Sequence, residues 1–311
     1  MKVKTLELLP SESRIILKEN VRRELFHDKK FVAKKLGLSV KTIENWIRAD
    51  YRPSLKQLTD FGIKKSANFF EKIDSVGISK SKHNLFLPVS IESKNVSWLV
   101  GIMEGDRAGE KEISVGLTNE NPVLIKKFIN SLRWLNVSKK EIKIKVQITK
   151  GDKLNKKFVS NKFQVPIENI SVSESEIPRK MPIMQALINR KILAHILYKI
   201  KNLILEGKSG NKSVREFIKG FCDAEGSVNV RKRTIEIKQK NTAEGKKIVY
   251  FISKNLISLG IKNSINGPNS ENMLIVRLAG GKKNAGNLRK FYNVIGFSSK
   301  EKLKKLKGIL F

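Results

Sequence analysis

Two stretches of similar sequence decide the fold of this chain, "WLVGIMEGDRAGE" at residues 98–110 and "FIKGFCDAEGSVN" at residues 217–229. Each is an apolar run that ends in an acidic residue and is followed by mixed polar and apolar residues. Aligning the two runs superimposes Asp106 on Glu225. The pattern predicts two equivalent helices, each with an acid at its C-terminal end and a strand after it.

The similarity extends beyond these helices. Residues 112–137 and 234–261 each read as an alternating strand, a turn that contains asparagine and an amphipathic helix. The chain therefore holds two copies of one unit of roughly 110 residues, whereas a solenoid needs at least three copies. We expect a molecule with pseudo-twofold symmetry, in which one chain forms its own dimer.

Small residues mark the place where the two halves would meet. Gly101 and Gly105 are four residues apart in the first run, and Gly220 and Ala224 have the same spacing in the second. Residues at this spacing lie on one face of a helix, and small residues let two backbones approach closely. Packing the helices through these faces would bring both acids to one end of the pair.

Net charge indicates the class of partner. The 311 residues include 63 Lys and Arg against 29 Asp and Glu, which gives a formal charge of +34. Because a soluble domain is well served by a net charge of magnitude about 2–8, this excess calls for a polyanion. The basic residues are spread along the expected strands and helices and form neither a tail nor an amphipathic anchor. We therefore expect nucleic acid as the partner and no membrane association.

The sequence also favours a location inside the cell. Its one cysteine, Cys222, excludes an internal disulfide, and charges interrupt the first residues, "MKVKTLELLP", in a way that does not fit a signal peptide. No apolar run approaches the roughly 20 residues of a membrane helix. We expect a reducing compartment such as the cytoplasm, the nucleoid or an organelle matrix.

Residues 31–48, "FVAKKLGLSVKTIENWIR", show two helical patterns separated by Gly37, with Ser39 placed to cap the second helix. The pattern resembles a Cro/repressor-type helix-turn-helix over roughly residues 15–63. The resemblance implies that the second helix contacts base edges and phosphates. The residues that point away from its apolar stripe, and that we expect to bind DNA, are Lys41, Thr42, Asn45 and Arg48.

The two acid-ended runs resemble the LAGLIDADG motif of homing endonucleases. The first copy is Leu99–Arg107, where Arg107 replaces the terminal glycine, and the second is Ile218–Gly226. The likeness extends over about residues 92–311. It implies an α+β fold made of two αββαββα-like repeats with curved antiparallel sheets.

Two acids at neighbouring helix ends favour the binding of a divalent cation. An acid at a helix C-terminus is unfavourable by about 0.3–1 kcal/mol, and two acids side by side repel each other. A hard divalent cation relieves both effects. The family resemblance implies that Asp106 and Glu225 are catalytic and hold Mg²⁺ or Mn²⁺ for phosphodiester hydrolysis, and that Lys240 helps to hold water and phosphate. The corresponding position of the first repeat lies near Asn119, so one lysine is absent there.

Two basic segments are candidates for holding DNA. The first is "IKIKVQI" at residues 142–148, which alternates apolar and polar residues. The second is "VNVRKRTIEIKQ" at residues 228–239, which also intersperses basic and apolar residues. A strand places such alternating sets on opposite faces, and a basic face suits the major groove. We expect DNA contacts from Lys143, Lys145, Gln147, Arg231, Arg233 and Lys238.

The expected organisation has four segments. They are an all-α helix-turn-helix DNA-binding domain at residues 1–72, a linker at 73–91, and LAGLIDADG repeats at 92–205 and 206–311. The predicted function is that of a single-chain homing endonuclease, a monomer with an internal pseudo-dimer that cuts both strands of duplex DNA, as in intron homing. Two alternatives stay open: a DNA-binding transcription regulator that has lost cleavage, and a maturase that binds intron RNA.

Overall fold

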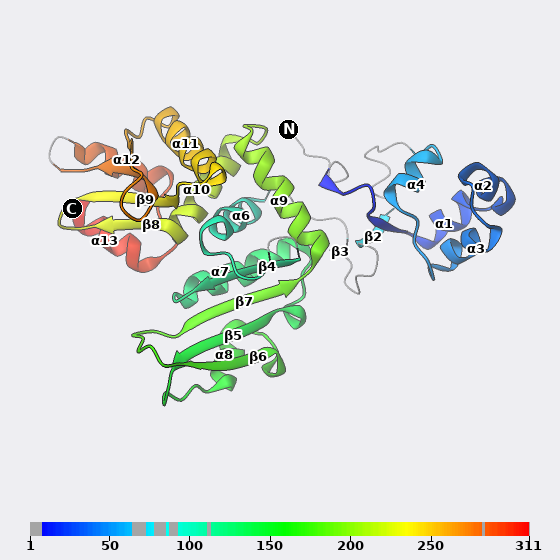
Figure 1. Cartoon of the computed structure of the whole chain (residues 1–311), viewed down its shortest axis with the longest axis horizontal. Helices are drawn as coiled ribbons and strands as arrows, with labels where there is room; N and C mark the ends of the chain where they lie inside the picture. The colour runs from blue at the N-terminus through cyan, green and yellow to red at the C-terminus, as the bar shows by residue number, and fades with distance from the viewer. Residues whose placement is uncertain are drawn as a thin grey trace.

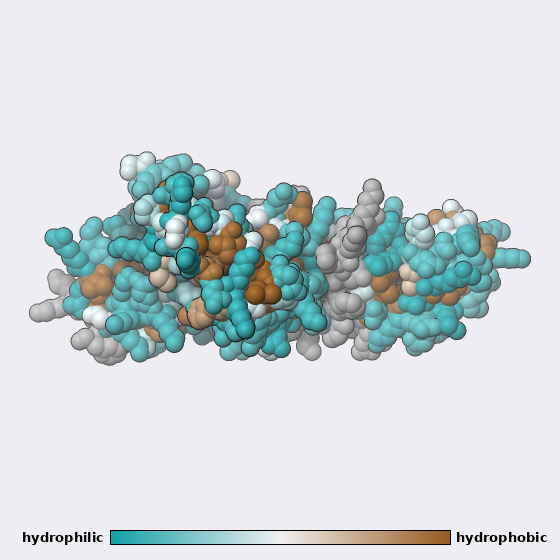
Figure 2. Space-filling model, turned by 90° about the horizontal axis from the view of Figure 1, so that it is seen from below, coloured by the Kyte–Doolittle hydropathy of each residue, from teal (hydrophilic) through white to brown (hydrophobic). Residues whose placement is uncertain are grey.

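The computed structural model describes residues 8–63, 73–77, 85–86, 93–110, 113–281 and 284–310. These residues form an N-terminal module and two larger units, with helices α6 (Lys94–Asp106) and α10 (Asn211–Glu225) where the two units meet (Figure 1). Seen from below, most of the surface is hydrophilic (Figure 2). Across the described residues, no helix combines the length and the apolar character needed to cross a membrane.

The N-terminal module contains four short helices. They are α1 (Glu19–Leu25), α2 (Lys29–Leu36), α3 (Val40–Arg48) and α4 (Leu55–Asp60). Between α2 and α3, Gly37 has a φ of 63°, in the left-handed region that favours glycine. The Ser39 hydroxyl accepts a 3.1 Å hydrogen bond from Thr42 N and caps α3. Trp46 is buried against Phe26, with ring centroids 5.5 Å apart. The turn and the cap lie where the sequence predicts them.

The expectation of an all-α module is wrong, because the module includes a three-stranded sheet. β1 (Arg14–Leu17) pairs antiparallel with β2 (Ile73–Gly77), which pairs with β3 (Leu85–Phe86). The expected linker, residues 73–91, therefore supplies two strands of this sheet. The three strands have 4, 5 and 2 residues, which is too short for a clear alternation in the sequence.

The two motif helices touch through their glycines. A Cβ built on Gly101 would lie 2.0 Å from the carbonyl oxygen of Phe217, and a Cβ built on Gly220 would lie 2.1 Å from that of Trp98. Side chains larger than hydrogen cannot be accommodated at these distances, so both positions require glycine. The contacts are reciprocal, as the predicted pseudo-twofold symmetry requires.

The first repeat contains a mixed four-stranded sheet. After α6 its elements are β4 (Ser114–Asn119), α7 (Pro122–Leu132), η2 (Arg133–Leu135), η3 (Lys139–Glu141), β5 (Lys143–Thr149), α8 (Lys156–Phe163), η4 (Ile167–Asn169), β6 (Ile170–Ser175), β7 (Ile183–Asn189) and α9 (Lys191–Leu205). The strand order is β4-β7-β5-β6. The predicted antiparallel pairing holds for β4, β7 and β5, but β6 runs parallel to β5. The chain reaches β6 through α8, and such a crossover returns it in the same direction.

The second repeat contains an antiparallel sheet. After α10 its elements are β8 (Gly226–Asn229), β9 (Thr234–Lys240), α11 (Ala243–Ser258), β10 (Ser264–Asn266), β11 (Met273–Ala279), α12 (Ala285–Val294) and α13 (Lys300–Leu310). The strand order is β10-β11-β9-β8. Ile235 and Ile237 of β9 are buried against the core, and the intervening side chains are more exposed. The two repeats together form the predicted α+β fold with pseudo-twofold symmetry.

Candidate active site and nucleic-acid interface

Asp106 and Glu225 are the last residues of α6 and α10, so helix packing brings both to one end of the pair. A Cβ built on Gly105 would lie 2.5 Å from the Cβ of Ala224 and 2.7 Å from the Cγ of Glu225. The Glu225 side chain therefore crosses the opposite helix one residue before Asp106. The structure brings together the two acids that the repeat singles out, and their catalytic and metal-binding roles remain predictions.

Burial governs the ionisation of both acids. It raises the pKa of Asp106, and a 2.6 Å hydrogen bond that Asn119 Nδ2 donates to Asp106 Oδ2 opposes this shift. Burial also raises the pKa of Glu225, and the negative charge of Asp106 raises it further. The two acids influence each other in this way because both end helices that are in contact.

A lysine that the sequence does not single out lies beside the pair. Lys302 of α13 donates from Nζ to three carbonyl oxygens in the last turn of α10. They belong to Cys222 at 3.2 Å, Asp223 at 2.6 Å and Ala224 at 3.1 Å. The helix dipole is negative at this end, and the ammonium lowers the pKa of both acids. Lysines recur throughout α13, and nothing in their pattern distinguishes this one.

Arg107 does not disturb the end of α6. Its φ and ψ are −59° and 136°, close to the −80° and 138° of Gly226 in the second motif, and any residue can adopt them. Glycine is needed at position 226 for space, because a Cβ there would lie 2.5 Å from the carbonyl oxygen of Cys222. The departure of the first motif from the family pattern is therefore compatible with the same helix ending.

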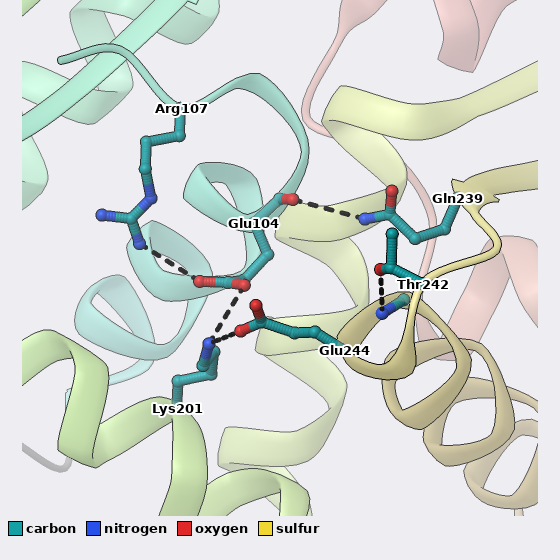
Figure 3. Close-up of polar contacts among 7 residues, drawn as sticks. Glu104, Arg107, Lys201, Gln239, Thr242 and Glu244 are labelled. Carbon is teal, nitrogen blue, oxygen red and sulfur yellow. Dashed lines mark hydrogen bonds and ion pairs between the residues drawn. The ribbon is translucent and has the colours of Figure 1, made fainter. Parts of the chain in front are cut away.

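Glu104, two residues before the first acid, belongs to an ion network between the repeats (Figure 3). Its carboxylate pairs with Arg107 at 3.2 Å and with Lys201 of α9 at 3.4 Å. Lys201 also pairs with Glu244 of α11, and Gln239 of β9 donates to the Glu104 carbonyl oxygen. Because Lys201 is only 1% exposed, we interpret this network as structural.

Asp223 takes the equivalent place on the second helix. Its Oδ2 accepts a hydrogen bond from Trp98 Nε1 at 2.7 Å, and its Oδ1 accepts from the main-chain N–H groups of Ser298 and Ser299. The side chain is buried and both oxygens are engaged. Asp223 therefore holds α10 against α6 and the α12–α13 connection.

Lys240 is the lysine that the sequence predicts to be catalytic. It is exposed at the end of β9, and no hydrogen bond or ion pair of its side chain to Asp106 or Glu225 is found within the described ranges. Its catalytic role remains a prediction.

Strand pairing identifies the counterpart of Lys240 in the first repeat. Gly226 lies opposite Ile237 in the second repeat, and Arg107 lies opposite Leu117 in the first. Three residues after each of these partners come Lys240 and Glu120. The first repeat therefore has an acid where a second lysine would stand.

A cavity of about 470 Å³ opens next to the last turn of α10. The loop after β4 in the first repeat lines it from one side, and β8 and α13 of the second repeat line it from the other, with Lys302 and Lys305 among the lining residues. Since a water molecule takes about 30 Å³, hydrated ions and a phosphate group fit this space.

The donor set at the acid pair fits an open divalent-metal site. Mg²⁺ is typically held by one or two carboxylates, with waters and substrate phosphates completing its shell. In the parts of the chain that the structure describes, no group of three or more His, Cys, Asp and Glu side chains is arranged to hold a metal. Asp106 and Glu225 supply the two carboxylates of such a donor set.

The predicted DNA-binding residues of β5 share one exposed face. Lys143 and Lys145 are exposed and Gln147 is half-buried, whereas Ile144 and Val146 between them are buried. Alternation along the strand thus separates a basic face from the core.

The predicted residues of the second repeat are more scattered. Lys238 is half-buried on the polar face of β9, and Arg231 is exposed in the turn before it. Arg233, in the same turn, donates to the carbonyl oxygen of Ile309 at 2.6 Å, so its guanidinium is directed to the end of α13. The sequence reasoning missed Arg277 of β11, which pairs with Glu236 on the polar face of β9 at 3.0 Å.

The predicted DNA-binding residues of the N-terminal module all lie on α3. Lys41 and Arg48 are exposed, and Thr42 and Asn45 are half-buried. The Thr42 hydroxyl shares a 2.9 Å hydrogen bond with the Ser39 hydroxyl at the cap. Among these four residues, Lys41 and Arg48 are therefore the most accessible to a phosphate group.

Comparisons with known proteins give one family and several structures. Residues 212–296 match the family model of the LAGLIDADG-like domain. The curated proteins contain no match. The homing endonuclease I-DmoI in complex with DNA and Mn is similar at 21% identity over 67% of this chain and 98% of that chain, with a TM-score of 0.43. Mesophilic variants of I-DmoI are similar at 17% identity over 66% and 97%, with a TM-score of 0.44. Full-length DUF199/WhiA from Thermatoga maritima is similar at 12% identity over 72% and 62%, with a TM-score of 0.43.

The matched residues contain the second motif helix and its acid, and the first repeat carries the same helix, acid and glycine contact. The similarity that the comparisons show is thus to a LAGLIDADG-like domain, and it covers residues 212–296 of the second repeat.

Proposed function

We propose that this protein is a metal-dependent endonuclease that recognises a long, imperfectly symmetric duplex DNA site and cuts both strands. One observation carries the proposal: Asp106 and Glu225, from different repeats, adjoin at the ends of two helices that touch through glycine. A duplex has its own local twofold symmetry, so a pseudo-twofold protein can direct one acid toward each strand.

Asp106 and Glu225 would hold Mg²⁺ or Mn²⁺ between them and the scissile phosphates. The bound metal supplies Lewis-acid stabilisation of the phosphate and a water of lowered pKa. The Asn119 amide fixes one oxygen of Asp106 and leaves the other for a ligand. The Lys302 ammonium favours the ionised form of both acids, which metal binding requires.

Basic sheet faces would bind the duplex. Lys143, Lys145 and Lys238 carry positive charge on the polar faces of the two sheets, and Arg277 adds a further cation. Lysine neutralises phosphates, whereas Gln147 and arginine have the donor geometry to read adenine and guanine.

The test is a cleavage assay with purified full-length protein, Mg²⁺ and a randomised or genomic duplex library, followed by sequencing of the DNA ends. We expect ends at one preferred site. Glu225→Gln should abolish them and retain binding, because the amide keeps the size of the side chain and loses its charge. Glu216→Gln, an equal change on the same helix, should leave cleavage intact. Ends that persist in Glu225→Gln would refute the proposed role.

A second function, DNA-binding regulation without cleavage, is favoured by one observation. Glu120 stands at the position that corresponds to Lys240, so the first repeat lacks a basic group there. Tight binding to one duplex without DNA ends at any divalent metal would support the regulator. Preference for a folded intron transcript over duplex DNA would support an RNA maturase.

A further inference from the structure

The two sheets are built from different sets of strands. Chain order and pairing match β4 with β9, β7 with β11 and β5 with β10, and each set forms the same antiparallel triplet. Beyond this triplet, the second repeat adds β8 next to β9, whereas the first repeat adds β6 next to β5. The fourth strand is therefore on opposite sides of the triplet in the two repeats.

The strand next to the acid is reduced in the first repeat. In the second repeat, β8 starts at Gly226, directly after Glu225, and pairs with β9 over four residues. In the first repeat, as far as the described residues go, an isolated bridge between Arg107 and Leu117 and a 3.1 Å hydrogen bond from Ala108 N to the Gly116 carbonyl oxygen take its place. The chain then bends at Gly109, which has a φ of 76°.

β6 extends the polar face of the first sheet at the edge far from α6 (Figure 1). It lies in register with β5, so that Lys145 is opposite Ser171, and both are exposed. The neighbouring pair, Ile144 and Ile170, is buried. Residues directly opposite in a pair share a face, and Ser171 therefore continues the surface that carries Lys145.

We propose that the first repeat reads its half of the DNA site farther from the centre than the second repeat does, because β6 adds an outer strand and, among the described residues, an isolated bridge replaces the inner strand. This inference rests on the proposed binding of duplex DNA. Neighbouring strands are about 4.8 Å apart and base pairs rise by about 3.4 Å. Adding one strand at the outer edge of the sheet therefore lengthens the contacted DNA by one to two base pairs.

The chemistry of the two extra strands fits this asymmetry. β6 offers the Ser171 hydroxyl at the outer edge, and serine can contact either a base or a phosphate. β8 offers Ser227 and Asn229 on the corresponding face of the second sheet, and Ser227 is two residues after Glu225. The second half-site should be read near the centre of the duplex and the first half-site at its end.

The experiment uses the full-length protein, Ca²⁺ and the duplex that it selects from a randomised library. Hydroxyl-radical footprinting and single base-pair substitutions across the site would map contacts on both sides of the centre. We expect protection to extend one or two base pairs farther on one side. On that same side, base-pair substitutions next to the centre of the site should leave binding unchanged. Substitutions of the equivalent base pairs on the other side of the centre should weaken it.

A pair of variants assigns the longer side to β6. Ser171→Glu places an acid on the polar face of β6, and Lys157→Gln makes an equal change of net charge on α8, which contacts β6. Ser171→Glu should weaken binding about tenfold and remove only the outermost protection, whereas Lys157→Gln should change affinity less than twofold with the same footprint. Thermal unfolding of both variants checks that they are folded.

A footprint symmetric about the centre, or one that Ser171→Glu leaves unchanged, would overturn the inference. A preferred duplex that is bound and never cut would refute the nuclease alone, because footprinting requires only binding. Absence of any preferred duplex would overturn both proposals.

Discussion

At the scale of single residues, the surroundings of Asp106 and Glu225 disfavour the ionised form of both side chains. Burial raises the pKa of Asp106 and of Glu225, and the two carboxylates repel each other. A site in this state gains from any cation that enters it. The fixed cation is Lys302, and its position at the end of α10 makes it part of the helix ending as well as of the site.

Glu225→Gln should stabilise the metal-free protein at neutral pH. The pKa of Glu225 in the folded state is raised above its ordinary value of 4.5, so the ionised form is less favourable in the folded than in the unfolded chain. The variant should gain about 0.3–1 kcal/mol at pH 7–8, and the gain should vanish below the ordinary pKa, where both states are protonated. Urea unfolding in EDTA at several pH values measures this. An equal gain at pH 4 and pH 8 would contradict the explanation.

Lys302→Met should have two effects. It removes one donor from three carbonyl oxygens at the end of α10, which should lower the free energy of unfolding by about 1–3 kcal/mol. It also removes the charge that lowers the pKa of both acids, so the acidic limb of the cleavage profile should move to higher pH. Lys305→Met, which breaks an exposed pair with Glu301, should do neither. Unfolding curves and pH–rate profiles of both variants provide the measurement.

At the scale of elements, the contact between α6 and α10 fixes the geometry of the site. Each helix presents a glycine to a carbonyl oxygen of the other, so neither helix can shift without changing the spacing of the acids. The sequence predicted this contact from the spacing of small residues alone, because helical geometry places residues four apart on one face.

Gly220→Ala should destabilise the protein by about 2–3 kcal/mol, because a methyl group there meets the backbone of Trp98. Gly308→Ala is the matched control. A Cβ at that position of α13 meets nothing within 4 Å, so the helix should gain about 0.5–1 kcal/mol. Chemical unfolding of both variants checks the prediction. A Gly220→Ala protein as stable as the wild type would show that the helices can separate.

Local signals explain what the sequence predicted and what it did not. Gly37 predicts a turn because glycine tolerates a left-handed φ, and Ser39 predicts a helix cap because its hydroxyl accepts a main-chain hydrogen bond. The repeat of the motif predicts the paired acids. β6 gave no such signal, because the direction of a strand depends on the crossover that leads to it. Lys302 gave none either, because its role arises only when α13 packs against the end of α10.

At the scale of the whole molecule, net charge should dominate DNA binding. Each phosphate contact that is lost should reduce the slope of log affinity against log salt by about 0.9. Replacing Lys41 and Arg48 of α3 by glutamine should therefore reduce the slope by about 2 if α3 binds the same duplex. Replacing Lys18 and Lys56, which are also exposed in the N-terminal module, gives the same charge change. Equal slopes for the two double variants would place α3 away from the DNA.

The joining of both halves in one polypeptide has a consequence for redesign. In a symmetric homodimer every substitution occurs twice, so both halves of the target must change together. Here both halves must keep the contact of α6 with α10 through Gly101 and Gly220. Each sheet is free to vary by itself, as the different position of the fourth strand in the two repeats illustrates. Under the proposed function, one half of the molecule should accept a new target sequence, or be exchanged for that of a relative, provided that the crossing helix keeps its glycine.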